Sequence, residues 1–292
     1  MQNSRSQGVR ESVTALVETL GACSRSPGKD VVHHLRTGAR RCEAALDLLL
    51  QAKHHPSHDH AAATLRKLLR KIRRAAGPVR DLDVHRGLLK DLVLGEQRKA
   101  AASQSLEVRR DARKLDLWLR GRRRKSAVSL TEAAAKWRKK LDKAMEGFES
   151  KTYEHRPMAG GAADAALDAF AELTRRLPRL TPENLHDFRK GAKKARYMAE
   201  MEGARGRKVA APLNQMQDEI GIWHDWVVLS EEVRAALKTD SSELVAIIDV
   251  ERDRRYTVAY RTAMKLRAKL LVQWRAKKAK ISGHRAVRGH AA

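Results

Sequence analysis

Residues 33–41 read HHLRTGARR, and residues 186–194 read HDFRKGAKK. Both stretches follow the frame His-x-x-Arg-x-Gly-Ala-basic-basic. A second pair of stretches comes after them, because residues 77–84 read GPVRDLDV and residues 221–228 read GIWHDWVV. Two landmarks that recur in the same order predict a duplicated architecture.

The composition predicts an almost wholly helical protein. The chain of 292 residues has only seven prolines and long stretches of Ala, Leu, Lys, Arg and Glu, which are strong helix formers. We expect helices in the first half at about 8–20, 31–52, 61–76, 81–93, 96–119 and 129–150. The second half should repeat this plan at about 162–177, 182–202, 207–220, 224–238 and 242–280. The expected breaks include Gly77-Pro78, the basic stretch 120–126 and the residues just before 224.

Basic side chains recur at helical spacing in both motifs. At about 100° per residue, His33, Arg36 and Arg40 fall within one sector of roughly 60°. This sector flanks the apolar stripe of the helix, so we expect it to line a groove between helices. The second copy carries a matching sector of His186, Arg189, Lys193 and Arg196.

Two glycines occupy these motif helices. Gly38 and Gly191 each cost about 1 kcal/mol relative to alanine, and therefore predict close approach of another backbone or of a ligand. The two copies are not equivalent, because Arg196 aligns with Glu43.

The helix after the first motif adds Arg66, Arg70 and Arg73 at i, i+4 and i+7. Like charges at this spacing destabilise an isolated helix, so the pattern favours an anionic ligand. The corresponding positions of the second half hold Ala210, Asn214 and Gln217. We therefore expect the first half to be the stronger anion surface.

The formal net charge of +26 and the pI near 10.6 indicate a polyanionic partner. The segment from Arg275 to Ala292 carries six basic residues and no acids, so its removal from +26 leaves +20 for the rest of the chain. No apolar run approaches the roughly 20 residues that span a bilayer. The polar N-terminus offers no signal peptide, and we expect a soluble, cytoplasmic protein without a membrane partner.

Other features point to no catalytic, metal or cofactor site. His54, His55, His58, Asp59 and His60 lie in a proline-containing turn with irregular spacing, so we expect no tuned metal site there. Asp81 and Asp225 are interpreted as helix caps or as partners for nearby arginines. Cys23 and Cys42 are expected to be reduced structural thiols. The run Arg122–Lys125 is a weak signal for nucleic acid.

The two motifs, each present twice and in the expected order, resemble the two halves of a CHAD domain (conserved histidine α-helical domain). The resemblance covers about residues 8–275 and implies an all-α fold of two pseudo-symmetric four-helix units, 8–155 and 160–275, around a basic central cavity. It also implies that the ligand is inorganic polyphosphate, with localisation to polyphosphate granules. Residues 276–292 are expected to form a disordered basic tail.

The resemblance and the charge pattern together define the expected polyphosphate-binding residues. These are His33, Arg36, Arg40, Arg41, Arg66, Arg70, Arg73, Arg80, His186, Arg189, Lys190, Lys193, Lys194, Arg196 and His224. Arg and Lys suit this ligand because it has many charges and no base edges to read. A nearby polyanion favours protonated histidine, so binding should tighten below about pH 7.

Two other readings stay open. A nucleic-acid-binding protein would explain the charge but predicts stacking aromatics or a recognition helix. A polyphosphate-processing enzyme predicts an acidic metal-binding cluster; an accessory subunit of such an enzyme would need no cluster of its own. We expect a non-enzymatic binding protein.

Overall fold

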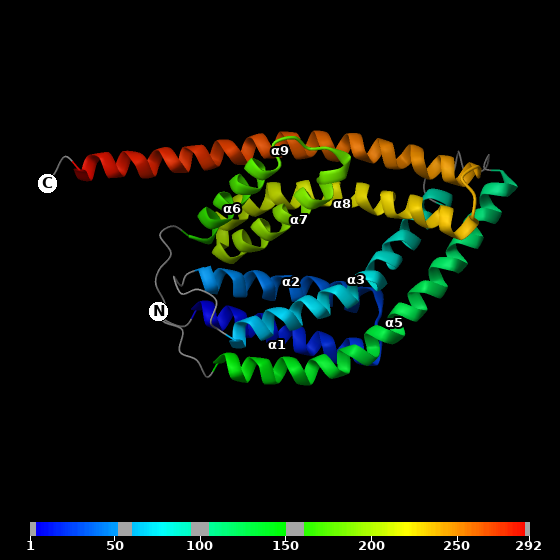
Figure 1. Ribbon diagram of the computed structural model, residues 1–292, viewed down its shortest axis with the longest axis horizontal. Coiled ribbons are helices and arrows are strands. Elements are labelled where there is room, and N and C mark those ends of the chain that lie inside the picture. The colour runs from blue at the N-terminus through cyan, green and yellow to red at the C-terminus, as the bar shows by residue number, and fades with distance from the viewer. Residues whose placement is uncertain (1–3, 52–59, 95–104, 150–160, 290–292) are drawn as a thin grey trace. The chain divides into compact units, whose positions relative to one another are not determined.

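The computed structural model describes residues 4–51, 60–94, 105–149 and 161–289. These residues are helical apart from short connections, and none of them lies in a strand, so the predicted all-α class is confirmed. The elements are α1 (Ser4–Arg25), α2 (Lys29–Gln51), α3 (His60–Leu94), α5 (Leu106–Glu149), α6 (Ala162–Arg176), α7 (Pro182–Ala199), the 3-10 turn η1 (Glu200–Glu202), α8 (Gly203–Leu237) and α9 (Glu243–Gly289) (Figure 1).

Three predicted helix breaks are wrong. Helix α3 continues through Gly77-Pro78, although an interior proline removes a backbone hydrogen bond and costs about 3 kcal/mol. Buried Ile72 and Val79 lie on either side of this point. Their burial holds the helix together where the local signal indicates a stop.

Packing also explains why the other two predicted breaks do not occur. The basic stretch 120–126 lies inside α5, between the buried side chains Leu119 and Ala127, and Arg and Lys are themselves good helix formers. Helix α8 passes through residues 220–224 with Ile220 and Trp223 buried. Packing on both sides of each point outweighs a local sequence signal.

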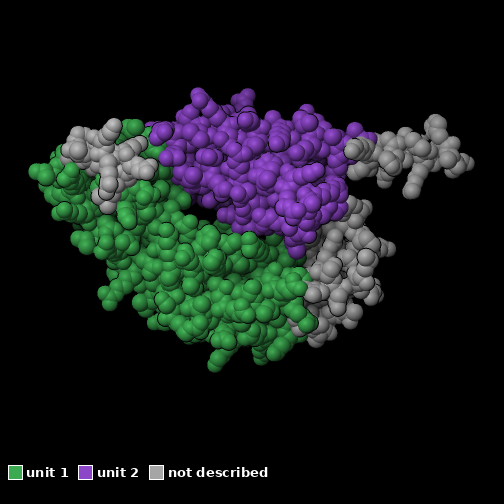
Figure 2. All heavy atoms as spheres, turned by 180° about the vertical axis from the view of Figure 1, so that it is seen from behind, with its two compact units in different colours: residues 1–157, 225–252 green, residues 158–224, 253–292 purple. Residues whose placement is uncertain are grey.

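The chain forms two compact units (Figure 2). Unit 1 contains residues 1–157 and 225–252, and unit 2 contains residues 158–224 and 253–292. The predicted halves 8–155 and 160–275 differ from these units in one segment, because residues 225–252 pack within unit 1. Helices α8 and α9 therefore each contribute to both units.

The core of unit 1 lies between α1, α2, α3 and α5. Its members include Leu16, Leu35, Leu69 and Leu130, which have at most 1% of their surface exposed. Cys23 and Cys42 are buried free thiols in this region. Burial raises the pKa of Cys23 to about 11 and that of Cys42 to about 12. Both thiols therefore stay protonated at neutral pH, as expected for structural cysteines.

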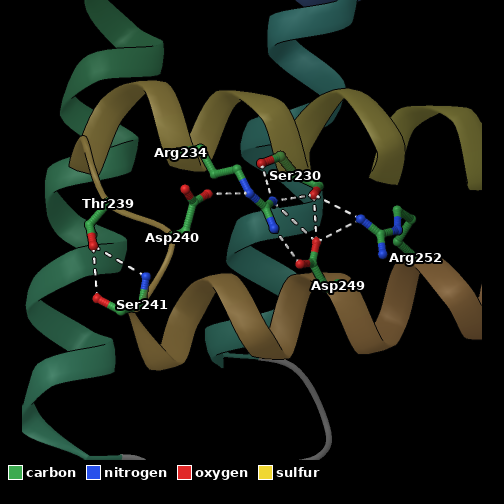
Figure 3. A network of polar contacts seen from close by, with 7 residues as sticks. All are labelled: Ser230, Arg234, Thr239, Asp240, Ser241, Asp249 and Arg252. Atoms are coloured by element: carbon green, nitrogen blue, oxygen red, sulfur yellow. Dashed lines mark hydrogen bonds and ion pairs between the residues drawn. The ribbon is translucent and has the colours of Figure 1, made fainter.

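An ionic network fixes the hairpin between α8 and α9 in unit 1 (Figure 3). Arg234 donates to Asp249, to Asp240 at 2.8 Å and to the Ser230 hydroxyl at 2.6 Å. Arg252 donates to Asp249 at 2.9 Å. Burial raises the pKa of Asp249, but hydrogen bonds from Arg234 and Ser230 outweigh it, so the pKa lies below its ordinary value.

The prediction that residues from 276 onward form a disordered tail differs from the structure, in which α9 includes most of them. The helix continues past residue 275 to Gly289, because Ala, Lys and Arg favour helix in this stretch. Within unit 2, Lys277 Nζ lies 2.7 Å from Asp168 Oδ2, and Trp274 Nε1 donates to Asp168 Oδ1 at 2.9 Å. At least the beginning of the tail is thus tied to α6.

Candidate basic binding rows

The two sequence motifs of unit 1 meet across the α2–α3 helix pair. Arg36 Nη1 donates to the carbonyl of Gly77 at 3.4 Å and to Asp81 Oδ1 at 2.5 Å. Arg80 Nε donates to His33 Nδ1 at 3.4 Å. As the residue number rises along α2 from His33 to Arg36, the number of its partner on α3 falls from Arg80 to Gly77. The two helices are therefore antiparallel. The interpretation of Asp81 as a partner for an arginine is confirmed.

Further along the same pair, arginines of α3 reach carboxylates of α2. Arg73 Nε donates to Glu43 Oε2 at 3.0 Å, and Arg66 Nη2 donates to Asp47 Oδ1 at 2.5 Å. Burial raises the pKa of Glu43 above its ordinary value, and the charges of Arg73, Arg70 and Arg40 oppose this effect. Glu43 is therefore surrounded by cations.

We call these basic residues of the α2–α3 pair the first basic row. Its members are His33, Arg36, Arg40, Arg66, Arg70, Arg73 and Arg80. Six arginines against the carboxylates of Glu43, Asp47 and Asp81 leave a formal charge of +3.

The α7–α8 pair of unit 2 repeats these contacts. The rings of His186 and His224 stack with centroids 3.8 Å apart and an interplanar angle of 28°. Arg189 Nε donates to the carbonyl of Gln217 at 3.1 Å, and a Cβ atom at Gly221 would overlap the Arg189 guanidinium. The residue pairs His33–Arg80 and Arg36–Gly77 thus correspond to His186–His224 and Arg189–Gly221.

The second basic row consists of the corresponding residues of this pair, together with Lys190 and Arg196, which align with Thr37 and Glu43. Its members are His186, Arg189, Lys190, Lys193, Arg196 and His224. Arg196 hydrogen-bonds to Asn214 Oδ1 and lies 3.5 Å from Glu200, and Lys190 lies 2.6 Å from Asp187. The repeated sequence motifs are therefore repeated helix-to-helix contacts.

The motif glycines accommodate leucines of the preceding helices. A Cβ atom at Gly38 would lie 3.3 Å from Leu16 Cδ1, and one at Gly191 would lie 2.5 Å from Leu173 Cδ1. The close approach predicted for these glycines is real. Its cause is a packed side chain from α1 or α6, and the predicted neighbouring backbone or ligand is not needed to explain it.

Two predicted site residues lie beside the rows. Arg41 and Lys194 are exposed, each about 100° further round its helix than Arg40 and Lys193. The sequence reasoning did not identify the carboxylates of Glu43 and Asp47 as part of the first row. Their spacing could have identified them, because Arg40, Glu43 and Asp47 stand at i, i+3 and i+7 and so lie on one face of the helix.

Other predicted features fall outside the rows. Part of the basic run 122–125 is held within unit 1, because Arg122 donates to Glu232 at 3.0 Å and Arg123 donates to Asp83 at 2.7 Å. His54, His55, His58 and Asp59 lie outside the described residues, and within the described ranges no His, Cys, Asp and Glu group is arranged to hold a metal. No helix in the described part of the chain has the length and apolarity needed to cross a bilayer.

Comparison with protein-family models finds one match. The model of the CHAD domain matches residues 9–234, which include both motif pairs. A search of curated proteins finds no match to this chain.

Proposed function

Because the chain belongs to the CHAD domain family, we propose that it binds inorganic polyphosphate through the two basic rows, without catalysing a reaction on it. The observation that carries this proposal is the alignment of cations along both helix pairs. The resemblance suggests two pseudo-symmetric four-helix units around a central basic cavity, which stays a prediction, and association with cytoplasmic polyphosphate granules.

The length of the first row favours an extended anion. Arg66 and Arg80 are fourteen residues apart on α3, which corresponds to about 21 Å at 1.5 Å per residue. A single phosphate reaches only two or three side chains of such a row. A polyphosphate chain has a negative charge at every unit and can contact the whole row.

The ion pairs of the first row orient its guanidinium groups. A guanidinium has five N–H donors, so the single contacts of Arg66 and Arg73 to carboxylates leave donors for a ligand. The Nη1 atom of Arg80 is buried, with no hydrogen-bond partner among the described residues. A buried cationic donor without an acceptor is costly, and an anion at this row would supply one.

Two rows on one chain favour long ligands over short ones. Once one row has bound a segment of polyphosphate, the other row meets the same molecule at a raised effective concentration. Orthophosphate gains nothing from the second row. We therefore expect affinity to rise steeply with chain length.

A charge-matched pair of variants tests the role of the rows. The row variant is R40Q/R70Q/K190Q/K193Q, and the off-row variant is K90Q/K114Q/K125Q/K208Q. Both remove four positive charges, and all four off-row lysines are exposed. At about 1 kcal/mol for each partly exposed contact, the row variant should lose roughly a thousandfold in affinity for long polyphosphate.

Calorimetric titration with long polyphosphate, orthophosphate and duplex DNA provides the measurement, after circular dichroism has shown that both variants are folded. The off-row variant should bind long polyphosphate like the unmodified chain. Equal losses in both variants, or displacement of polyphosphate by DNA at lower phosphate concentration, would contradict the proposal. Phosphate release from polyphosphate with Mg²⁺ would contradict its non-enzymatic part.

A further inference from the structure

A concave basic surface lies on unit 1, on a different face of α3 from the first basic row. Its volume is about 640 Å³, and its lining includes Lys67 and Lys71 of α3 and Lys140 and Lys143 of α5. Lys67 and Lys71 each follow a row arginine by one position, and so lie about 100° further round the helix. We call this surface the lysine groove.

The lysines of this groove have no acidic partner within the described ranges 4–51, 60–94, 105–149 and 161–289. All four side chains are exposed, and none of them forms an ion pair with a described residue. Among the described lining residues there is no carboxylate. Lys67 and Lys71 stand at i, i+4, and Lys140 and Lys143 at i, i+3, where like charges repel each other.

The other basic hollow of unit 1 provides a contrast. Arg86 and Arg120 both pair with Asp116, and Arg123 pairs with Asp83. Glu132 also lines that hollow. The described part of unit 1 therefore neutralises most arginines of one basic surface with its own acids, whereas none of its described acids pairs with the four lysines of the groove.

We infer that the lysine groove binds a compact oligophosphate of three or four phosphate units. Each ammonium group is a point charge with three donors, which suits phosphate oxygens. The first turn of α3 lines the same groove with His60 and Ala61, and Thr64 follows them. The positive end of the helix dipole adds to the potential. The volume is in the range of small-molecule sites.

The chemistry of the lining narrows the ligand class. The described lining residues include no Phe, Tyr or Trp, and their one ring is the imidazole of His60, while Leu68 and Ala144 belong to the apolar part of the lining. The four lysines therefore favour a ligand that is held through its phosphate groups. The inference does not depend on the two basic rows, since no residue is shared with them.

Inorganic tripolyphosphate is the probe for this groove. The groove variant K67Q/K71Q/K140Q/K143Q removes four exposed charges and should weaken tripolyphosphate binding to the full chain at least tenfold in calorimetric titration. The off-row variant and the row variant should each change it by less than about threefold. Tripolyphosphate should also protect Lys67, Lys71, Lys140 and Lys143 of the unmodified chain from acetylation, as mapped by mass spectrometry.

Several results would overturn the inference. The groove variant could bind tripolyphosphate as tightly as the off-row variant, or the row variant could lose the binding instead. Protection spread evenly over all lysines would show a general basic surface. Displacement of tripolyphosphate by polyglutamate at lower charge equivalents would assign the groove to an acidic protein segment. Failure of the proposed function is distinguishable, because it would appear as unchanged affinity of the row variant for long polyphosphate.

Discussion

Replacing Glu43 by glutamine should tighten polyphosphate binding. Glu43 lies among Arg40, Arg70 and Arg73, and the second row has Arg196 at its aligned position. The substitution preserves the shape of the side chain and raises the formal charge of the first row from +3 to +4.

The magnitude follows from the geometry. Glu43 Oε2 lies 3.0 Å from Arg73 Nε, so a phosphate that accepts from the other side of the guanidinium would lie roughly 6 Å from the carboxylate. Two unit charges at roughly 6 Å repel by about 0.7 kcal/mol in water and about 2.8 kcal/mol at an effective dielectric constant near 20. Taking a value near 1 kcal/mol, we expect about fivefold tighter binding.

The fold should tolerate this substitution. Burial raises the pKa of Glu43, so the fold favours its neutral form. Stability linked to this carboxyl is fully present below its unfolded pKa and is lost as pH rises through its folded pKa. A neutral glutamine should therefore leave the thermal midpoint at pH 7 unchanged or slightly raised.

The assay is calorimetric titration of E43Q with long polyphosphate at physiological ionic strength and pH 7.5. The control is E18Q, which removes an exposed carboxylate of α1 and changes the net charge equally. If E43Q binds no tighter than E18Q, Glu43 does not face the ligand, and the placement of polyphosphate on the first row is refuted.

Three further predictions concern stability, each measured by thermal and denaturant unfolding. Gly191→Ala should destabilise by about 1–2 kcal/mol because its Cβ would lie 2.5 Å from Leu173, whereas Gly38→Ala should be neutral or stabilising; equal effects would contradict the packing. Gln217→Met should stabilise by about 1 kcal/mol, because both buried amide atoms lack a hydrogen-bond partner among the described residues; a loss would reveal a hidden partner. Asp249→Asn should destabilise by about 1 kcal/mol at neutral pH. Its lowered pKa makes this difference present above the unfolded value near 4 and lost as pH falls through the folded pKa; a difference that persists at lower pH would contradict the network.

The paired contacts of the rows were predictable from the sequence in part. The constant frame shared by His33 and His186 locates both motif helices, and helical spacing selects the side chains on one face. The sequence does not show which helix packs beside each motif helix. The i+3 and i+7 acids Glu43 and Asp47 read as ordinary surface residues until α3 supplies Arg73 and Arg66.

The wrongly predicted helix breaks also show that the sequence does not reveal packing partners. Gly77-Pro78 and the run 120–126 are local signals, whereas the energy that overrides them comes from burial of the side chains on either side against other helices. The tail from residue 276 was expected to be disordered because it is basic and carries no acids. Asp168, more than a hundred residues earlier, provides the acceptor for Lys277, and spacing along the chain does not reveal such a partner.

The most direct test of the central claim counts the polyphosphate contacts of the rows. For a flexible polyanion, the logarithm of the binding constant falls with the logarithm of the salt concentration, with a slope of about 0.7 for each neutralised charge. If the rows hold the chain, the row variant R40Q/R70Q/K190Q/K193Q should reduce this slope by about 3. The off-row variant K90Q/K114Q/K125Q/K208Q should leave it unchanged. Equal reductions in both variants would contradict the account and would show that polyphosphate binds to the charge of the whole surface.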